Sequence, residues 1–284
     1  MTLALLPVLA VAQTVTLSTP VLQSNGTGAT DVEVTLNAAV SSQSAASVTG
    51  TDTLQEFAIS PADQVATGLP SQLNLFCTEL GQDAPGYGIS SPQTYTILPI
   101  TSGDMGRASN SIDAIDGVPV TGIGNGMATK LEKLYGYVFP SYTSSSPLSI
   151  NLGIALVGGS GASYSSAVFQ LAAWQIAETN TYANITNPGP AVSGFYVSSD
   201  KINGVVDSGG LLVQDADTLL RAVANATNVT SLNLDSLHSD SAQDFILPDP
   251  TGSYLSIPEP GMYAAVIGVA ALGLAAIRRE RKPA

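Results

Sequence analysis

An uncharged apolar run near the C-terminus places the strongest constraint on the fold of this chain. It covers residues 262–277, 16 positions of mostly Ala, Val, Ile, Leu and Gly, between Pro258-Glu259-Pro260 and a basic cluster that begins with Arg278 and Arg279. Proline fixes φ and has no backbone N–H, so the Pro-Glu-Pro element ends any preceding structure. As a helix the run would be about 24 Å long, slightly short of a hydrocarbon core of about 30 Å. Basic residues are typical of the cytoplasmic end of a membrane helix, so the sequence predicts a single C-terminal transmembrane helix.

The order of these three parts, within residues 251–284, resembles the PEP-CTERM sorting signal of Gram-negative, exopolysaccharide-producing bacteria. The resemblance implies export, transient anchoring in the inner membrane through the C-terminal helix, and processing by an exosortase-type enzyme near Pro258, Glu259 and Pro260. The protein would then reside at the cell surface or outside the cell. A permanent C-terminal membrane anchor is the alternative, because short motifs also occur by chance.

The other end of the chain indicates a signal peptide at residues 1–12. Residues 3–12 are apolar, and Ala10-Val11-Ala12 forms a small-x-small cleavage site before Gln13. No Lys or Arg precedes the apolar stretch, so either the start codon is misassigned or part of the leader is missing. Between the two ends lies a body of residues 13–250, which we expect to form one large domain.

The composition of this body excludes some classes of partner. It holds five basic residues against twenty acidic ones, which gives a net charge of about −15. So acidic a surface argues against binding of nucleic acid or anionic polysaccharide through bulk charge. Charged residues make up 11% of the whole chain, against about 25% in ordinary globular proteins. This composition is typical of bacterial surface and extracellular matrix proteins.

Hydrophobic periodicity predicts an α+β fold. Period-two alternation indicates two or three strands within residues 14–59. Further strands are predicted at residues 72–80, 94–99, 148–157 and 242–247, and helices at residues 126–138, 165–179 and 210–226. We therefore expect a strand-rich half at residues 14–96 that forms a β-sheet or sandwich, helices packed on it, and one closing strand.

The predicted helix at residues 165–179 is the clearest element of the chain. It is apolar nearly all round, so we expect it to be buried, with Ser165 or Ser166 as its N-cap. Gln170 places a strongly polar amide among apolar neighbours, on the same face as Ala173 and Trp174. A buried carboxamide without partners costs about 1–3 kcal/mol, so something should satisfy it.

The only cysteine of the chain, Cys77, lies in the apolar strand predicted at residues 72–80. It cannot form an internal disulfide. In an exported chain an odd cysteine indicates an intermolecular bridge, a reactive thiol, a metal ligand or inert burial.

The Cys77 strand and the Gln170 helix together resemble the thioester domains of bacterial surface adhesins. Phe76-Cys77 matches the aromatic-Cys motif, and residues 169–174 (Phe-Gln-Leu-Ala-Ala-Trp) match the apolar-Gln-x-x-apolar-apolar motif. The helix that ends with Tyr135 also occupies the position of a family helix with an aromatic end. The resemblance covers residues 73–178, and Thr78 departs from it, since the family often has an apolar residue there.

This resemblance implies an internal thioester between Cys77 and Gln170, formed with loss of ammonia and without a cofactor or metal. It implies an apolar shell composed of Phe76, Phe169, Ala173 and Trp174. An amine-bearing surface partner would then attack the thioester and become covalently attached. The protein would be an adhesion or attachment module and not an enzyme, apart from autocatalytic formation of the bond.

Two other interpretations of the same residues stay open. In the first, Cys77 is a buried small hydrophobic residue and Gln170 is held by backbone groups, so the protein is a purely structural matrix or surface protein. In the second, the protein is a secreted hydrolase that uses Cys77 and the only histidine, His238. The sequence shows no third group to orient this histidine, and its Ser- and Asp-rich surroundings predict a solvated loop residue.

Overall fold

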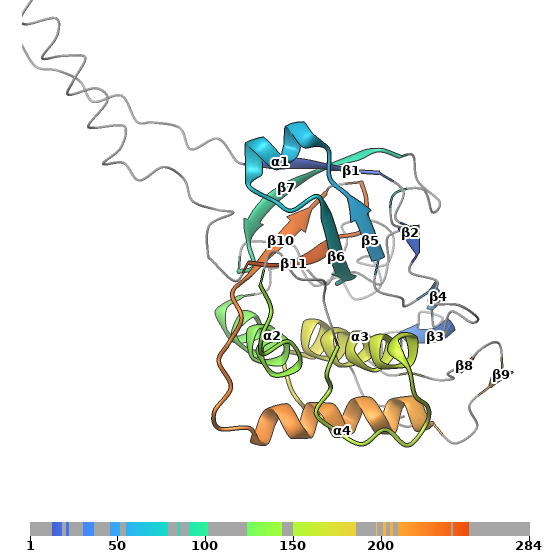
Figure 1. The fold of residues 1–284 in the computed structure, drawn as a ribbon. Helices are drawn as coiled ribbons and strands as arrows, with labels where there is room; N and C mark the ends of the chain where they lie inside the picture. The colour runs from blue at the N-terminus through green and yellow to red at the C-terminus, as the bar shows by residue number, and fades with distance from the viewer. Residues whose placement is uncertain are drawn as a thin grey trace, which may run out of the picture.

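The computed structural model describes fourteen stretches of the chain, and the remaining residues are drawn as a thin grey trace in Figure 1. The described stretches are residues 13–18, 21–22, 31–36, 46–51, 55–78, 85, 91–101, 124–143, 150–185, 197, 201–202, 205–206, 210–239 and 241–249.

The main element of the fold is an antiparallel sheet of seven strands in the order β1-β7-β10-β11-β6-β5-β2. Its strands are β1 (Thr14–Leu17), β2 (Val21–Leu22), β5 (Gln55–Ala58), β6 (Gln72–Cys77), β7 (Gln93–Pro99), β10 (Leu234–His238) and β11 (Phe245–Pro248). Apart from the two-residue β2 at its edge, the sheet curves until it is nearly closed. Helix α1 (Pro61–Thr67) follows β5 and contacts the opposite edge, since Asp63 Oδ2 accepts a hydrogen bond of 3.4 Å from the backbone N–H of Thr16 on β1.

The other described strands form two separate antiparallel pairs. Strand β3 (Asp31–Leu36) pairs with β4 (Ala46–Thr51), and β8 (Lys201–Ile202) pairs with β9 (Val205–Val206).

Three long helices lie on one side of the sheet: α2 (Gly124–Val138), α3 (Ala162–Thr179) and α4 (Leu211–Asn225). Figure 1 shows α2 and α3 beneath the sheet and α4 beneath both of them, so α3 lies between the sheet and α4. This position explains why α3 is apolar nearly all round, and the predicted buried helix is confirmed. The helix begins after Gly161, which has a φ of 99° and makes no side-chain cap, so the predicted caps Ser165 and Ser166 are wrong.

Both faces of the curved sheet are apolar. On the inner face the ring of Phe245 packs against Phe57 at 5.1 Å and against Tyr95 at 5.7 Å between ring centroids. On the outer face Phe76 points toward the helices and packs 4.5 Å from the ring of Phe169 on α3. A strand buried on both faces is expected to be continuously apolar, and all four residues of β11 are buried.

The predicted arrangement of the fold is wrong. The sheet is not confined to the N-terminal half, because β10 and β11 lie in its centre, between β7 and β6. Local periodicity identifies a strand but carries no information about its neighbours. Residues 14–59 contain five strands instead of two or three, and α1 was not predicted.

The strand predicted at residues 148–157 is also absent from the described residues 150–161, which connect α2 and α3. Asp215 on α4 instead accepts hydrogen bonds of 3.0 Å from the backbone N–H groups of Val157 and Gly158. These contacts hold the segment against α4 and not along a sheet edge. The apolar residues of this segment cover the outer side of the helices. Their alternation with polar residues therefore does not come from a strand.

The predicted C-terminal transmembrane helix, and with it the predicted localisation through an inner-membrane anchor, is not supported. Within the described ranges, no helix combines the length and the apolar character needed to cross a membrane. The run at 262–277 and the signal peptide at 1–12 both lie outside the described residues. We therefore do not retain the membrane helix as part of the fold or the localisation built on it.

Candidate functional site

Cys77 is the last residue of β6, where the sheet meets helix α3. It lies opposite Phe245 on β11, and the next residue continues the pairing, since Thr78 donates its backbone N–H to the Asp244 carbonyl at 3.1 Å. The cysteine is 8% exposed and contributes to the hydrophobic core. A neighbouring strand on one side and the helix layer on the other therefore fix its position.

Gln170 lies in the middle of α3, on the face that meets the end of β6. Its side chain is 2% exposed. The amide Nε2 donates a hydrogen bond of 2.7 Å to the backbone carbonyl of Cys77, and the Cys77 sulfur lies 3.7 Å from Oε1 in a thiol–carbonyl hydrogen bond. The structure thus brings together two residues that are 93 positions apart in the sequence.

The two contacts fix the amide group in one orientation relative to the thiol. One hydrogen bond holds the nitrogen, and the other directs the S–H toward the oxygen. Reacting atoms in a near-attack arrangement are about 3–3.5 Å apart, and the sulfur lies 3.7 Å from the oxygen of the carbonyl group that it would attack. Burial of both groups excludes most water from this place.

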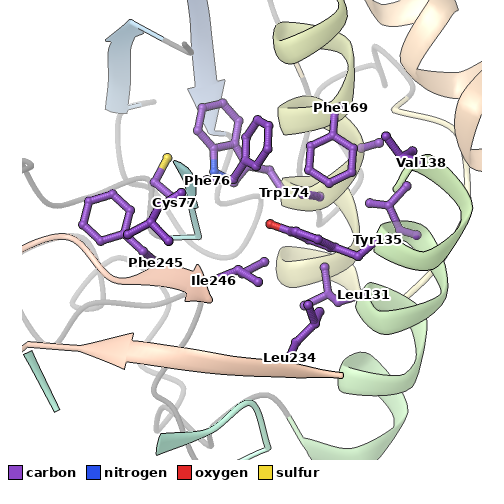
Figure 2. Close-up of a cluster of buried hydrophobic side chains, with 14 of the residues drawn as sticks. Phe76, Cys77, Leu131, Tyr135, Val138, Phe169, Trp174, Leu234, Phe245 and Ile246 are labelled. Atoms are coloured by element: carbon purple, nitrogen blue, oxygen red, sulfur yellow. The ribbon is translucent and has the colours of Figure 1, made fainter. Parts of the chain in front are cut away.

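Figure 2 shows a cluster of buried side chains next to Cys77, and aromatic rings form a large part of it. Phe76, which precedes Cys77, and Phe169, which precedes Gln170, pack on each other and on two rings of the α2 region, Tyr135 and Phe139. The predicted apolar shell of Phe76, Phe169, Ala173 and Trp174 is buried at 2% exposure or less. The four residues are therefore core residues, and their role as a shell around Cys77 and Gln170 stays a prediction.

Tyr135 is a residue of the site whose importance the sequence did not show. It is fully buried on α2, and its hydroxyl has no hydrogen-bond partner among the described residues. Burial raises the pKa of Tyr135 well above its ordinary value, and the charges of Cys77 and Tyr142 add to the rise. The sequence signal was only an aromatic residue at the end of the predicted helix, which is equally typical of a core position.

His238 is not a solvated loop residue, so that prediction is wrong. It ends β10, and its Nδ1 lies 2.8 Å from Oδ2 of Asp244. The other carboxylate oxygen of Asp244 accepts the backbone N–H of Ser239 at 2.7 Å. The orienting group that the sequence did not reveal is therefore Asp244, six residues further along the chain.

The strand register nevertheless separates His238 from the thiol. Leu237, Phe245 and Cys77 form one cross-strand row. Directly opposed residues of antiparallel strands point to the same face, and the following residue points to the other. His238 and Cys77 thus face opposite sides of the sheet, which is unfavourable for a Cys-His hydrolase.

A pair of buried acidic groups lies at the end of β10 that is opposite to His238. Asp235 and Asp249 are both buried, and Oδ2 of Asp235 has no hydrogen-bond partner in the described part of the chain. Burial raises the pKa of Asp235 to about 8, and the charge and hydrogen bond of Asp249 contribute to this rise. Among the described residues, no group of three or more His, Cys, Asp or Glu side chains could hold a metal ion.

The predicted sorting residues Pro258, Glu259, Pro260, Arg278 and Arg279 lie outside the described residues. Comparison with known proteins adds no assignment: no protein-family model, no curated protein and no solved structure matches the chain.

Proposed function

We propose that Cys77 and Gln170 form an internal thioester through which the protein attaches covalently to an amine-bearing partner. One observation carries the proposal: the Cys77 sulfur lies 3.7 Å from Oε1 of Gln170 while Nε2 of the same amide is bonded to the Cys77 carbonyl. A thiol and a carboxamide from distant segments are thus held in contact within the buried core. A thiol attacks best as the thiolate and an apolar site raises its pKa, so proximity has to supply most of the rate.

The bond-forming step is balanced without any other reactant. The sulfur of Cys77 attacks Cδ of Gln170, the S–C bond forms, and the C–N bond to Nε2 breaks. The thiol proton leaves with the nitrogen as ammonia. The product is an electrophile, and the buried surroundings protect it from hydrolysis.

Attachment is the second step. A lysine amine of a partner attacks the Gln170 acyl carbon, forms an amide bond and releases the Cys77 thiol. The protein's own lysines on α2 are engaged elsewhere: Lys130 bonds to Asn180 Oδ1 at 2.9 Å, and Lys133 bonds to the Ala224 carbonyl at 3.2 Å. These contacts favour reaction with a partner over reaction within the chain.

The second candidate function is that of a purely structural surface or matrix protein, and one contact favours it. The 2.7 Å hydrogen bond from Gln170 Nε2 to the Cys77 carbonyl already satisfies part of the buried amide without any covalent bond. In that case the thiol would be an ordinary small core residue. The two candidates differ in a single measurable property, the mass of the folded protein.

Intact mass spectrometry of the purified protein under reducing conditions tests the proposal. We expect a mass about 17 Da below the sequence mass, resistance of the native thiol to alkylation, and addition of methylamine to Gln170 with release of the Cys77 thiol. Cys77→Ala and Gln170→Ala should each abolish the mass deficit and the methylamine addition, and the thiol of Gln170→Ala should lose the protection that the bond gives. A mass equal to the sequence mass, with no methylamine addition, would contradict the proposal and favour the structural candidate.

Gln175→Ala is the matched control for this experiment. Gln175 lies on the same helix and is likewise buried, at 3% exposure, and its Oε1 has no hydrogen-bond partner among the described residues. The variant should retain the mass deficit, which separates loss of the reacting carboxamide from general damage to α3.

Processing of the chain at Pro258, Glu259 and Pro260 by an exosortase-type enzyme remains a separate prediction from the sequence. It concerns how the protein is sorted. The thioester proposal does not depend on it.

A further inference from the structure

Two buried hydrogen-bond donors beside the Cys77–Gln170 pair have no partner among the described residues: the hydroxyl of Tyr135 and the indole Nε1 of Trp174. The other buried side-chain atoms without partners are carboxamide or carboxyl oxygens at Gln13, Gln175 and Asp235. In this set of atoms from the described residues, the donors are thus the Tyr135 hydroxyl and the Trp174 indole N–H. Figure 2 shows both residues in one buried cluster with Cys77.

The ring of Tyr135 contacts the two aromatic residues that directly precede Gln170 and Cys77 in the sequence. Its ring packs against Phe169, one residue before Gln170, at 4.9 Å, and against Phe76, one residue before Cys77, at 6.4 Å between ring centroids. In Figure 2 the hydroxyl points away from α2, toward the side of the cluster on which Cys77 lies. Burial raises the pKa of this hydroxyl, and the charge of Cys77 contributes to the rise.

Trp174 is placed by the helix that carries Gln170. The two residues are four positions apart on α3, so their side chains are neighbours on one helix face. Long side chains in a helix lean toward its N-terminus, which brings the indole over the turn of Gln170. Its ring is 2% exposed, and Figure 2 shows it next to Phe76.

We propose that Tyr135 and Trp174 are the donors that stabilise the negative charge on Gln170 Oε1 during formation and opening of the thioester; this inference rests on the proposed function. As the S–C bond forms, the electron pair of the carbonyl moves onto Oε1. When the pair returns, the C–N bond breaks, and the nitrogen leaves as ammonia with the thiol proton. Neither donor changes its protonation state, so both serve again when an amine opens the bond.

A preorganised donor is most effective where charge develops, and loss of one such donor typically slows a reaction by about 10²–10³-fold. A phenylalanine in place of Tyr135 would fill the same space without an unsatisfied hydroxyl. The presence of two such donors is unexplained by packing alone. It is explained if they receive a partner only in the transition state.

The test compares full-length wild type with Tyr135→Phe and Trp174→Phe. Each protein is refolded under reducing conditions, and the loss of about 17 Da is timed by intact mass spectrometry. The loaded protein is then opened with methylamine, and this rate is measured in the same way. We expect each variant to slow both steps by roughly a hundredfold or more. The midpoint of urea unfolding of Tyr135→Phe should equal or exceed that of wild type.

Tyr95→Phe is the matched control, because Tyr95 is equally buried but its hydroxyl donates to the Gln243 carbonyl at 3.1 Å. It should lower the unfolding midpoint and leave both rates unchanged. Wild-type rates in Tyr135→Phe would overturn the inference while the proposed function stands. A wild-type protein that never loses 17 Da would overturn both. Tyr135→Phe keeps the test decisive if Trp174→Phe does not fold.

Discussion

At the scale of single residues, the fold maintains several polar groups in places where water cannot reach them. Gln170 has hydrogen bonds at both ends of its amide, whereas Tyr135 and Asp235 each retain an atom without a partner in the described structure. A buried polar atom without a partner costs about 1–3 kcal/mol. The buried amide of Gln170 is explained by the proposed bond. The unpartnered hydroxyl of Tyr135 is explained by the proposed transition state. The third, Asp235, has a consequence for stability.

The unfolding free energy should depend on the protonation of Asp235. Its folded pKa of about 8 is raised from an ordinary value of 3.8, chiefly by burial. The folded state therefore binds this proton more tightly than the unfolded state does. Its contribution to stability is complete below pH 3.8 and is lost as the pH rises through about 8, with a slope of at most about 1.4 kcal/mol per pH unit.

Urea unfolding of wild type and Asp235→Asn at pH 5 and pH 9 measures this effect. The neutral amide imitates the protonated acid, so the variant should be similar to wild type at pH 5 and more stable than wild type at pH 9. Asp249→Asn should reduce the pH dependence in part, because it removes the second cause of the raised pKa. Identical pH profiles for wild type and Asp235→Asn would contradict the assignment.

At the scale of elements, the packing of α2 is controlled by a glycine. A Cβ at Gly136 would overlap the backbone carbonyl oxygen of Thr230, in the segment between α4 and β10. The same segment is bonded to α2, since Leu232 donates its backbone N–H to the Glu132 carbonyl at 3.1 Å. Because both partners are backbone, neither can move easily, and α2 depends on this close approach.

Gly136→Ala should therefore destabilise the protein by about 1–3 kcal/mol, the usual cost of overpacking. Gly126→Ala is the control on the same helix, because its new Cβ would meet only the Asn180 side chain, at 3.6 Å. An alanine there should be neutral or stabilising by up to about 1 kcal/mol. Chemical denaturation of both variants measures the difference, and equal stabilities would show that the segment at Thr230 adapts.

The elements also show what sequence can and cannot predict here. The three long helices were predicted to within a few residues, because the 3.6-residue period of α2, α3 and α4 reflects which face each helix buries. The contact between Cys77 and Gln170 was anticipated from two short motifs, and the structure brings these residues together. The helices rest on a signal within one segment, whereas the contact rests on the resemblance to a family in which the two motifs occur together.

What the sequence did not predict depends on distant partners. The central position of β10 and β11 follows from pairing with β7 and β6, which no local pattern encodes. Asp244 was missed as the partner of His238 because a contact across a strand connection has no fixed spacing. The hydroxyl of Tyr135 was missed because a tyrosine and a phenylalanine give the same apolar periodicity.

At the scale of the whole molecule, the proposed thioester would be a covalent cross-link between the sheet and the helix layer. It joins residues 93 positions apart. In the chain-entropy model, a cross-link that closes a loop of about 90 residues stabilises the folded state by about 4–5 kcal/mol. Opening the bond should remove this contribution while the surrounding fold stays the same.

Urea unfolding before and after methylamine treatment measures the contribution of the cross-link. Wild type should lose several kcal/mol of unfolding free energy on treatment, by the same chain-entropy argument. Cys77→Ala should show no change, because it has no bond to open. An unchanged midpoint in treated wild type that carries the methylamine adduct would contradict a stabilising cross-link.

The position of this bond also determines how the protein responds to pulling. Cys77 and Gln170 are 93 positions apart, and this length of chain would span roughly 300 Å when fully extended. With the thioester intact, a tensile load on the two ends of the body bypasses this length, so the protein behaves as a short tether. Once an amine has opened the bond, the same segment can unravel under force. Opening of the bond by an amine would therefore make the body extensible under a load between its two ends.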